Sequence, residues 1–435
     1  MLNFIARPMV RVVDRYLPDP YIFVIILTVV VMAAAMLFEG QSPMAVAAMW
    51  GDGFWALLQF AMQMVLVLVT GYMMASTPLV RKGLAKLAGL ASSAGGAILL
   101  VSVVSLAASW INWGFGLVVG ALFAKEIAKQ VRVDYRLLIA SAYSGFIVWH
   151  GGLAGSVPLA IATAGHPFEA QIGVIGTSQT IFSFFNLAIV VALFIVVPLV
   201  NRMMLPSEAD SVFVDPALLE EKEVKQPEVM TPAERLQNSM ILTGLIGLAG
   251  VAYLIQYFLG GGTLTLNIVN FLFLIVAIIL HGTPRNLLAA LEEGVKGASG
   301  IVIQFPFYAG IMAIMVQSGL AASVSEWLVS LATPGSFPFF AFISAGIVNF
   351  FVPSGGGQWA VQAPVILPAA EALGVDAARA AMAVAWGDAW TNMVQPFWAL
   401  PILGIAGLKA KDIMGFCTLH LILSGAIIAL GLTVL

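Results

Sequence analysis

Long apolar runs follow one another along almost the whole chain, separated by short polar stretches. The first run, Tyr21 to Phe38, can cross a bilayer, because a helical span needs about 17–25 predominantly apolar residues. Only 9% of the 435 residues are charged, whereas about 25% are charged in soluble domains. Strands of a membrane β-barrel alternate apolar and polar residues, and these runs do not alternate. We therefore expect an all-α polytopic membrane protein.

The composition argues against several functional classes. The single cysteine, Cys417, excludes an intrachain disulfide and a cysteine-based metal site. His166, His281 and His420 stand isolated in the sequence and predict no metal constellation. The net charge of −3 gives no general attraction to nucleic acid. Walker, HExxH and GxSxG motifs are absent from suitable contexts, so no cofactor is expected.

The few basic residues indicate the topology. Arg7, Arg11 and Arg15 precede the first span, which places the N-terminus in the cytoplasm by the positive-inside rule. Tracing the spans puts about 18 of the 19 Lys and Arg residues on that same side. Residues 201–237 are polar and rich in acidic side chains, and they read as a flexible cytoplasmic linker between two halves.

Three unusual features recur at a spacing of about 242 residues, which is typical of an internal repeat. They are an amphipathic stretch (Leu79–Leu90 and Leu320–Ala332), a Gly-rich interruption between two apolar arms (109–116 and 349–359) and an apolar segment broken in its middle (143–158 and 386–401). The extra span Met240 to Phe258 inverts the second copy. The arms around the interruptions suit re-entrant hairpins that meet near the midplane.

We therefore predict two inverted repeats joined by the linker. Each contains a re-entrant hairpin and a broken transmembrane helix. The predicted bounds are 1–200 for the first repeat (hairpin about 91–127, broken helix about 137–163) and 238–435 for the second (hairpin about 337–373, broken helix about 380–408). Paired Gly- or Pro-interrupted segments of this kind indicate a transporter binding site.

The backbone at such helix breaks indicates which kind of ligand they bind. Non-helical backbone at membrane depth must be buried or line a wet cavity, and helix N-termini at a break favour an anion. The tip segments contain no Lys or Arg, so a small monocarboxylate fits better than a multiply charged anion. Six Trp residues of the tip and break segments could wall a slot for an acyl chain: Trp113, Trp149, Trp359, Trp386, Trp390 and Trp398. For any single one of them, core packing or an interfacial belt is the better explanation.

Two ionisable residues lie within the presumed membrane depth, and an intramembrane charge is a functional candidate. His150, followed by Gly151 and Gly152, suits proton coupling or substrate binding; the alternative is a hydrogen-bonded buried imidazole. Asp388 suits binding of a cation or a proton; the alternative is a cap for part of its own broken helix.

Small polar residues at the breaks complete the predicted site. Asn112 and Ser354 at the tips are candidates for binding both substrate and the coupling ion, and Thr391 and Asn392 in the second break for binding substrate; turn and cap chemistry is the alternative. Trp113 is the candidate aromatic contact. Gly116 and Gly120 form a small-xxx-small pair, which favours close packing of hairpin arms over a dimer motif.

Four stretches carry a family resemblance: SWINWGFGLVVGALFAKEIAK, SAYSGFIVWHGGLAGSVPLA, NFFVPSGGGQWAVQAP and WGDAWTNMVQPFWALPILG. With them the chain resembles, over essentially its whole length, the short-chain fatty acid transporter family of the AtoE type, within the ion-transporter superfamily. The resemblance implies two opposed hairpins and a dimeric elevator mechanism. It also implies substrate contacts at the two tips. These are Asn112, Gly114 and Gly116 on one side and Ser354, Gly355, Gly356, Gly357 and Gln358 on the other. The dicarboxylate relatives bind sodium with Ser-Asn-Thr triplets, which this sequence lacks.

The expected function is import of butyrate, acetoacetate or a similar monocarboxylate across the bacterial inner membrane, coupled to H⁺ or Na⁺ and carried out by a homodimer. Two alternatives remain open. One is a carrier for other small organic anions such as dicarboxylates. The other is an intramembrane lipid-modifying enzyme, which would need an acid/base or nucleophile set near the interface that the chain does not offer.

Overall fold

A computed structural model describes residues 20–219, 230–349, 352–395 and 398–435, and every regular element in these ranges is a helix. Seven helices among these residues are long and apolar enough to cross a membrane. The basic flank Arg7, Arg11 and Arg15 and the middle of the predicted linker, 220–229, lie outside the described residues. So do Phe350 and Phe351 of the second interruption and Pro396 and Phe397 of the second broken segment.

The helices follow the apolar runs. The first half contains α2 (Pro20–Phe38), α3 (Pro43–Gly53), α4 (Leu58–Ala75), α5 (Pro78–Ala88), α6 (Ala94–Ile111), α7 (Trp113–Gln130), α8 (Tyr135–Ser144), η1 (Gly145–Gly151), α9 (Ser156–Ile161), α10 (Glu169–Ile172) and α11 (Phe184–Met203). The second half contains α13 (Met240–Leu259), α14 (Leu266–His281), α15 (Pro284–Ser318), α16 (Leu320–Leu331), α17 (Phe337–Val348), α18 (Gly355–Leu373), α19 (Ala377–Thr391), α20 (Ala399–Ala406) and α21 (Ala410–Val434). The short η2 (Glu208–Asp210), η3 (Pro216–Leu219) and α12 (Pro232–Gln237) lie between the halves.

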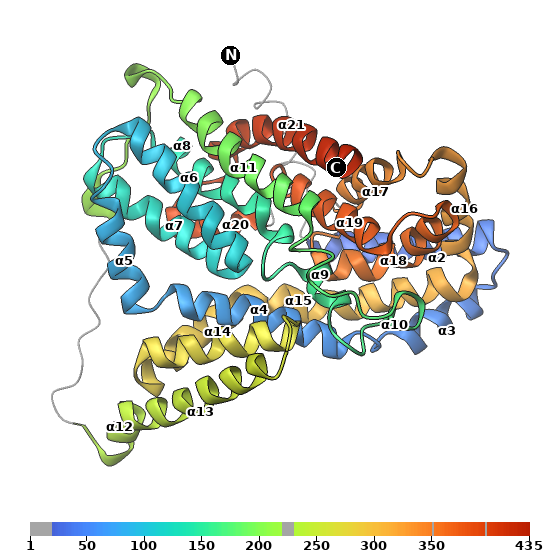
Figure 1. Cartoon of the computed structure of the whole chain (residues 1–435), viewed down its shortest axis with the longest axis horizontal. Coiled ribbons are helices and arrows are strands. Elements are labelled where there is room, and N and C mark those ends of the chain that lie inside the picture. The colour runs from blue at the N-terminus through green and yellow to red at the C-terminus, as the bar shows by residue number, and fades with distance from the viewer. Residues whose placement is uncertain (1–19, 220–229, 350–351, 396–397) are drawn as a thin grey trace.

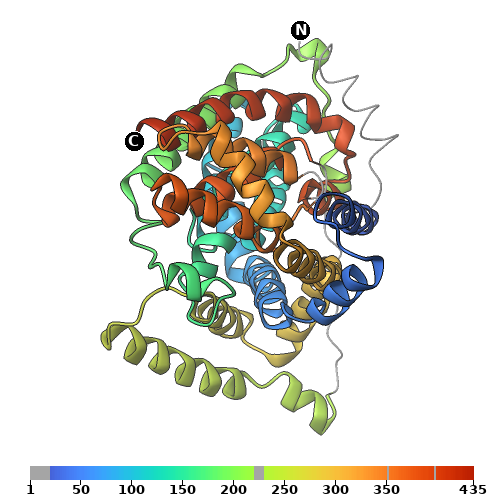
Figure 2. The ribbon, with the colours of Figure 1, turned by 90° about the vertical axis from the view of Figure 1, so that its right-hand side faces the viewer.

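Two long helices run side by side through the middle of the molecule. α4 packs against α15, with α14 and then α13 on one side and the hairpin helices on the other (Figure 1). α13 forms an outer edge (Figure 2), and its only buried residues are Thr243, Gly247 and Gly250, while most of its large apolar side chains are exposed. Gly247 and Gly250 let α13 approach Ile279 and Ile275 of α14 closely.

The order of elements recurs between the halves. Three pairs of equivalent helices have N-cap residues 242 positions apart: Thr77 and Gly319 before α5 and α16, Asn112 and Ser354 before α7 and α18, and Asp134 and Asp376 before α8 and α19. These three pairs of caps therefore stand at the predicted spacing. The internal repeat itself and the inverted orientation of its copies stay predictions.

The first hairpin turns more tightly than predicted. The expected interruption at 109–116 is a single non-helical residue, Asn112, whose backbone is extended (φ −158°, ψ 129°). Its Oδ1 accepts a hydrogen bond from the Phe115 amide (2.9 Å) and so caps α7 at once. Gly116 and Gly120 lie against Ser109 and Ser105 of α6, which confirms close packing of the hairpin arms.

Two helices begin at other residues than their apolar runs do. The apolar run 172–200 predicts a span over its whole length, but its helix begins only at Phe184, because Gly173 (φ +66°) ends α10 and residues 173–183 form no regular helix. The apolar run from Ile301 predicts a span that starts there, but it belongs to a helix that begins at Pro284, where the Thr283 side chain caps the Asn286 amide and proline occupies the first helical position.

One part of the predicted linker contacts the first half of the chain. The amide of Val212 donates to Asp134 Oδ2 (2.7 Å), and its carbonyl accepts from the Tyr135 amide (2.8 Å). The Arg132 guanidinium lies 4.3 Å from the centre of the Phe213 ring. Residues near 212 are thus docked on the start of α8, because Asp134 offers one oxygen to the α8 cap and the other to the linker.

Candidate functional site

The first helix break lies where α8 passes into the 3₁₀ helix η1 and then into non-helical residues 152–155. Gly152 fits there because a Cβ atom would collide with the backbone of Trp110. The Leu153 amide donates to the Trp110 carbonyl (2.7 Å), which ties the break to the end of α6. His150 Nε2 accepts from the Val157 amide (3.1 Å), so this buried imidazole caps the start of α9.

The second break begins after Thr391 and is organised by one amide. Asn349, at the end of α17, has its Nδ2 within 2.9 Å of the Asp388 carbonyl, Thr391 Oγ1 and Asn392 Oδ1. The Asn392 side chain donates in turn to Asp388 Oδ1 (3.3 Å). The second hairpin is thereby fastened to the second break, and the predicted residues Asp388, Thr391 and Asn392 form one buried cluster.

Both hairpin tips reach the first break. A Cβ atom on Gly355 would lie 2.5 Å from His150 Cε1 and 2.7 Å from Trp149 Cη2, so the second tip is in contact with both rings. From the first tip, Trp113 meets Trp149 edge to face, with ring centroids 5.9 Å apart. Trp113 also packs on Trp398, at the end of the second break, with ring centroids 5.2 Å apart. Trp149 and His150 therefore lie at the junction of both tips.

The other glycines of the predicted site let neighbouring helices approach closely and leave no open space beside them. Gly114 lies against Leu68 of α4, Gly356 against Phe60 of α4, and Gly357 against the Tyr308 ring of α15. Gly151 lies against Trp386 of α19. Each of these contacts seats a tip or a break on a neighbouring helix.

The polar side chains at the tips either cap a helix or hold two helices together. Asn112 and Ser354 cap α7 and α18, since their side chains accept from Phe115 N and Gly357 N, so the cap alternative is met for both. Gln358 donates to the Ala345 carbonyl and to Gln362 Oε1, and it holds the arms of the second hairpin together.

Several buried polar atoms at this junction have no hydrogen-bond partner among the described residues. Three of them are donors: Asn112 Nδ2, Trp113 Nε1 and Trp149 Nε1. Three are acceptors: Asn349 Oδ1, Gln358 Oε1 and Asp388 Oδ2. A buried polar atom without a partner costs about 1–3 kcal/mol. Such a cluster is therefore expected where a polar ligand or ion completes the bonding.

Sequence reasoning missed two asparagines of α11. Asn186 Oδ1 accepts a hydrogen bond from the indole N–H of Trp386 (3.0 Å), and Asn186 Nδ2 donates to the Gly151 carbonyl (3.0 Å). Asn186 therefore connects the first break to α19. Asn201 donates to Ser102 Oγ (2.9 Å) and Ser144 Oγ (2.8 Å). Both are polar residues in an otherwise apolar helix, and this contrast alone could have identified them from the sequence.

His420 was predicted to be isolated, and the structure corrects this. Its Nε2 lies 2.7 Å from Asn201 Oδ1, in a fully buried polar group that joins α21, α11, α6 and α8. Because an amide oxygen only accepts, Nε2 is the donor in this bond.

Known proteins resemble this chain over its whole length. The sequence profile of the family "Short chain fatty acid transporter" matches residues 1–435. An Escherichia coli protein is 47% identical over the full length of both chains, and a Haemophilus influenzae protein is 43% identical over 99% of each; both are named as candidate short-chain fatty acid transporters.

Solved transporters share the fold at low identity. The YdaH transporter of Alcanivorax borkumensis superposes with a TM-score of 0.61 at 17% identity, covering 95% of this chain and 98% of its own. Neisseria gonorrhoeae MtrF, described with a class of antimetabolite efflux pumps, gives 0.52 at 16% identity, covering 98% and 97%. The chain shares the fold of these two proteins, and its family together with its span-length apolar helices makes it a multi-pass membrane transporter. Within that class, the chain belongs to the short-chain fatty acid transporter family.

Proposed function

We propose that the protein is a secondary transporter that imports short-chain fatty acids such as butyrate or acetoacetate, with the carboxylate bound between the two hairpin tips. Family membership and the names of the relatives support this substrate class. The observation that carries the site is the convergence of the tips. Trp113 of the first and Gly355 of the second both contact Trp149, beside His150.

The chemistry of this junction suits a single carboxylate. The N-termini of α7 and α18 begin at the tips, and their backbone N–H groups and dipoles favour negative charge. The unpartnered N–H groups of Asn112, Trp113 and Trp149 are further donors, and the indole faces suit a short acyl chain. The tip segments supply no Lys or Arg to balance a second charge, which favours a monocarboxylate over a dicarboxylate.

A cation, H⁺ or Na⁺, is proposed to drive import through Asp388. The carboxylate is fully buried, and its Oδ2 has no partner among the described residues. The unpartnered oxygens Asn349 Oδ1 and Gln358 Oε1 come from the adjoining hairpin. Oxygen ligands of this kind suit a hard cation, and a carboxylate also suits a proton.

The proposed movement is an elevator-like shift of the hairpin helices against α4, α15, α14 and α13. The two halves are proposed to be inverted repeats in the bacterial inner membrane, with the N-terminus in the cytoplasm. The 12 residues of α17 give a helix of about 18 Å, short of the bilayer's hydrocarbon core of about 30 Å, which supports a re-entrant hairpin. A homodimer is proposed as the functional unit.

The decisive experiment is uptake of labelled butyrate into proteoliposomes, with the Na⁺ and pH gradients imposed separately. We expect accumulation under one gradient and competition by unlabelled acetoacetate. No uptake under either gradient, with acetate and succinate equally inert, would exclude a carboxylate carrier.

The site is tested in the same vesicles. Asn112→Ala and Ser354→Ala should abolish uptake without loss of expression. Ser93→Ala is the matched control, because Ser93 caps α6 at the end of the hairpin away from the tip. Normal uptake by both tip variants would show that the site lies elsewhere.

His150 is tested by its pH profile. We propose that His150 takes part in proton coupling, so His150→Gln should remove the pH dependence of uptake while a Gln oxygen still accepts from the Val157 amide. A retained profile would assign His150 to capping α9 alone.

A further inference from the structure

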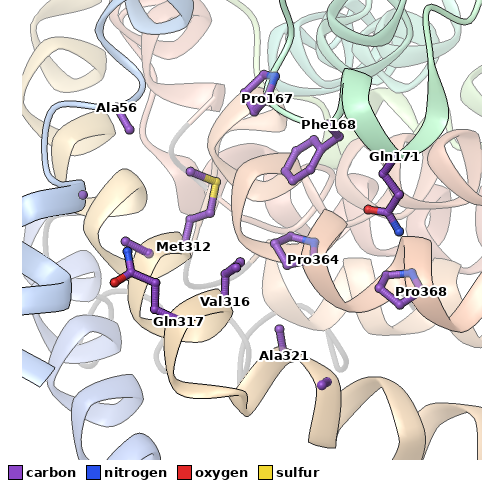
Figure 3. A pocket seen from close by; sticks show the side chains of 13 residues that line it. Ala56, Pro167, Phe168, Gln171, Met312, Val316, Gln317, Ala321, Pro364 and Pro368 are labelled. Carbon is purple, nitrogen blue, oxygen red and sulfur yellow. The ribbon is translucent and has the colours of Figure 1, made fainter. Parts of the chain in front are cut away.

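A cavity of about 540 Å³ lies away from the tips, between α15, α16 and α18 (Figure 3). Its walls include Phe168 beside α10, Val316 of α15 and Pro364 of α18. The volume falls in the range of about 300–1,000 Å³ that is usual for small-molecule sites. The residues that line it come from both the α15 side and the hairpin side of the molecule, which meet here.

A second cavity of about 90 Å³ adjoins the first. The two share Ala56 and Pro167, and the smaller one extends along α4 to Phe60. Phe60 is also the contact of the second tip, because a Cβ atom on Gly356 would lie 2.8 Å from Phe60 Cζ. The Phe60 ring therefore contacts the second tip and lines the smaller cavity.

A second aromatic contact joins the large cavity to α18. Phe168, from the wall of the large cavity, meets Trp359 edge to face at 5.7 Å. Trp359 belongs to the first turns of α18 and is buried. The Phe168 ring lies on the segment before α10, outside any long helix, so it is well placed to move without displacing a span.

The walls match the chemistry of a short fatty acid. Met312, Val316, Pro364 and Phe168 give apolar contact, and neither Lys, Arg, Asp nor Glu lines either cavity among the described residues. Amide groups stand at the sides, Gln171 on α10 and Gln317 on α15 (Figure 3). An amide N–H donates to a carboxylate, while the apolar wall takes the acyl chain.

We propose that the two cavities form the vestibule through which a short-chain monocarboxylate passes between the surface and the second tip, with Phe60 and the Phe168–Trp359 pair on the side that faces α18. The assignment rests on the proposed function. It adds a weak, transient substrate site outside the tips and names the residues that line it.

The first test is protection of an introduced thiol. Cys417 is buried, so the wild-type chain serves as the unlabelled blank. Ala322→Cys places a thiol in the cavity wall, and Ser323→Cys places one on the next residue, which is exposed but lines neither cavity. Butyrate should slow maleimide labelling of Ala322→Cys by about tenfold once it exceeds its dissociation constant about tenfold, and should leave Ser323→Cys unchanged. Equal labelling rates with and without butyrate at position 322 would overturn the vestibule.

The second test fills the junction of the cavities. Ala56→Trp should lower kcat/KM for butyrate uptake, and more so for hexanoate, because a longer acyl chain needs more of the blocked space. Ala48→Trp, on an exposed position of α3 that lines neither cavity, is the matched control. Wild-type kinetics in Ala56→Trp for both acids would also overturn the vestibule. Failure of the wild-type protein to take up butyrate would instead count against the proposed function.

Discussion

Gly355, the first residue of α18, lies against the imidazole ring of His150, 205 positions earlier in the chain, and a Cβ atom there would come within 2.5 Å of His150 Cε1. This contact joins the second hairpin tip to the first helix break. The same Cβ would also lie 2.7 Å from Trp149 Cη2, so no side chain fits without moving an aromatic ring.

Gly355→Ala should therefore impair both stability and uptake. An extra methyl group in a packed interior costs about 1–3 kcal/mol, and here it displaces the rings at the proposed site. We expect a lower Tm in detergent and a severe loss of butyrate uptake. Gly244→Ala is the control, because a Cβ atom on Gly244 in α13 would have nothing within 4 Å, and the Tm of this variant should stay or rise. An unchanged Tm and uptake in Gly355→Ala would show that the tip and the break are not packed as described.

A substitution series at Asn112 separates its two functions. Oδ1 caps α7, and Nδ2 has no partner among the described residues. Asn112→Asp keeps an acceptor for the Phe115 amide but replaces the free donor with a negatively charged oxygen. We expect a large rise in KM for butyrate although the cap is kept, whereas Asn112→Ala also loses the cap, at about 0.5–2 kcal/mol. Wild-type KM in Asn112→Asp would exclude Nδ2 from substrate binding.

The positions of many helices could be predicted from the sequence. The helix starts could be predicted because capping residues mark them: Asn112 and Ser354 cap α7 and α18, and Asp134 and Asp376 cap α8 and α19. Local signals of this kind depend on a few neighbouring residues and can be found in a single sequence. The same holds for the long apolar runs that become α4, α11 and α21.

What the sequence could not predict depends on contacts between distant segments. Nothing local places Gly355 beside His150, Asn201 beside His420, or Asn349 on the second break. The tip of the first hairpin was predicted too wide for a similar reason. Gly114 and Gly116 look like breakers in the sequence, but they are helical and small because α4 and α6 pack against them.

Asp388→Asn should uncouple transport from its driving ion. The amide introduced by this change keeps an oxygen for the Asn392 side chain, so the break should hold, but it carries neither a charge nor a titratable proton. We expect loss of gradient-driven accumulation, while exchange of labelled for unlabelled butyrate persists because the tips are unchanged. Asp376→Asn, at the exposed start of the same helix, should accumulate butyrate normally. Accumulation by Asp388→Asn at the wild-type level under the same gradient would exclude Asp388 as the coupling residue.

The buried group around Asn201 gives the sharpest stability test. Asn201 accepts from His420 and donates to Ser102 and Ser144, and Ser144 is the last residue of α8 before the first break. Asn201→Leu leaves the His420 N–H without its partner in a dry interior, which costs about 1–3 kcal/mol for each unsatisfied group. We expect a clear fall in Tm and reduced uptake, because the support of the break is weakened.

The double variant Asn201→Leu/His420→Leu distinguishes this cause from simple misfit. Replacing both partners with apolar groups removes the unsatisfied N–H, so part of the lost Tm should return. Asn238→Ala, at a partly buried position outside the core, should shift stability by no more than about 0.5 kcal/mol. If the destabilisation of the double variant equals the sum of those of the two single variants, Asn201 and His420 are not energetically coupled. Their hydrogen bond would then contribute nothing beyond packing.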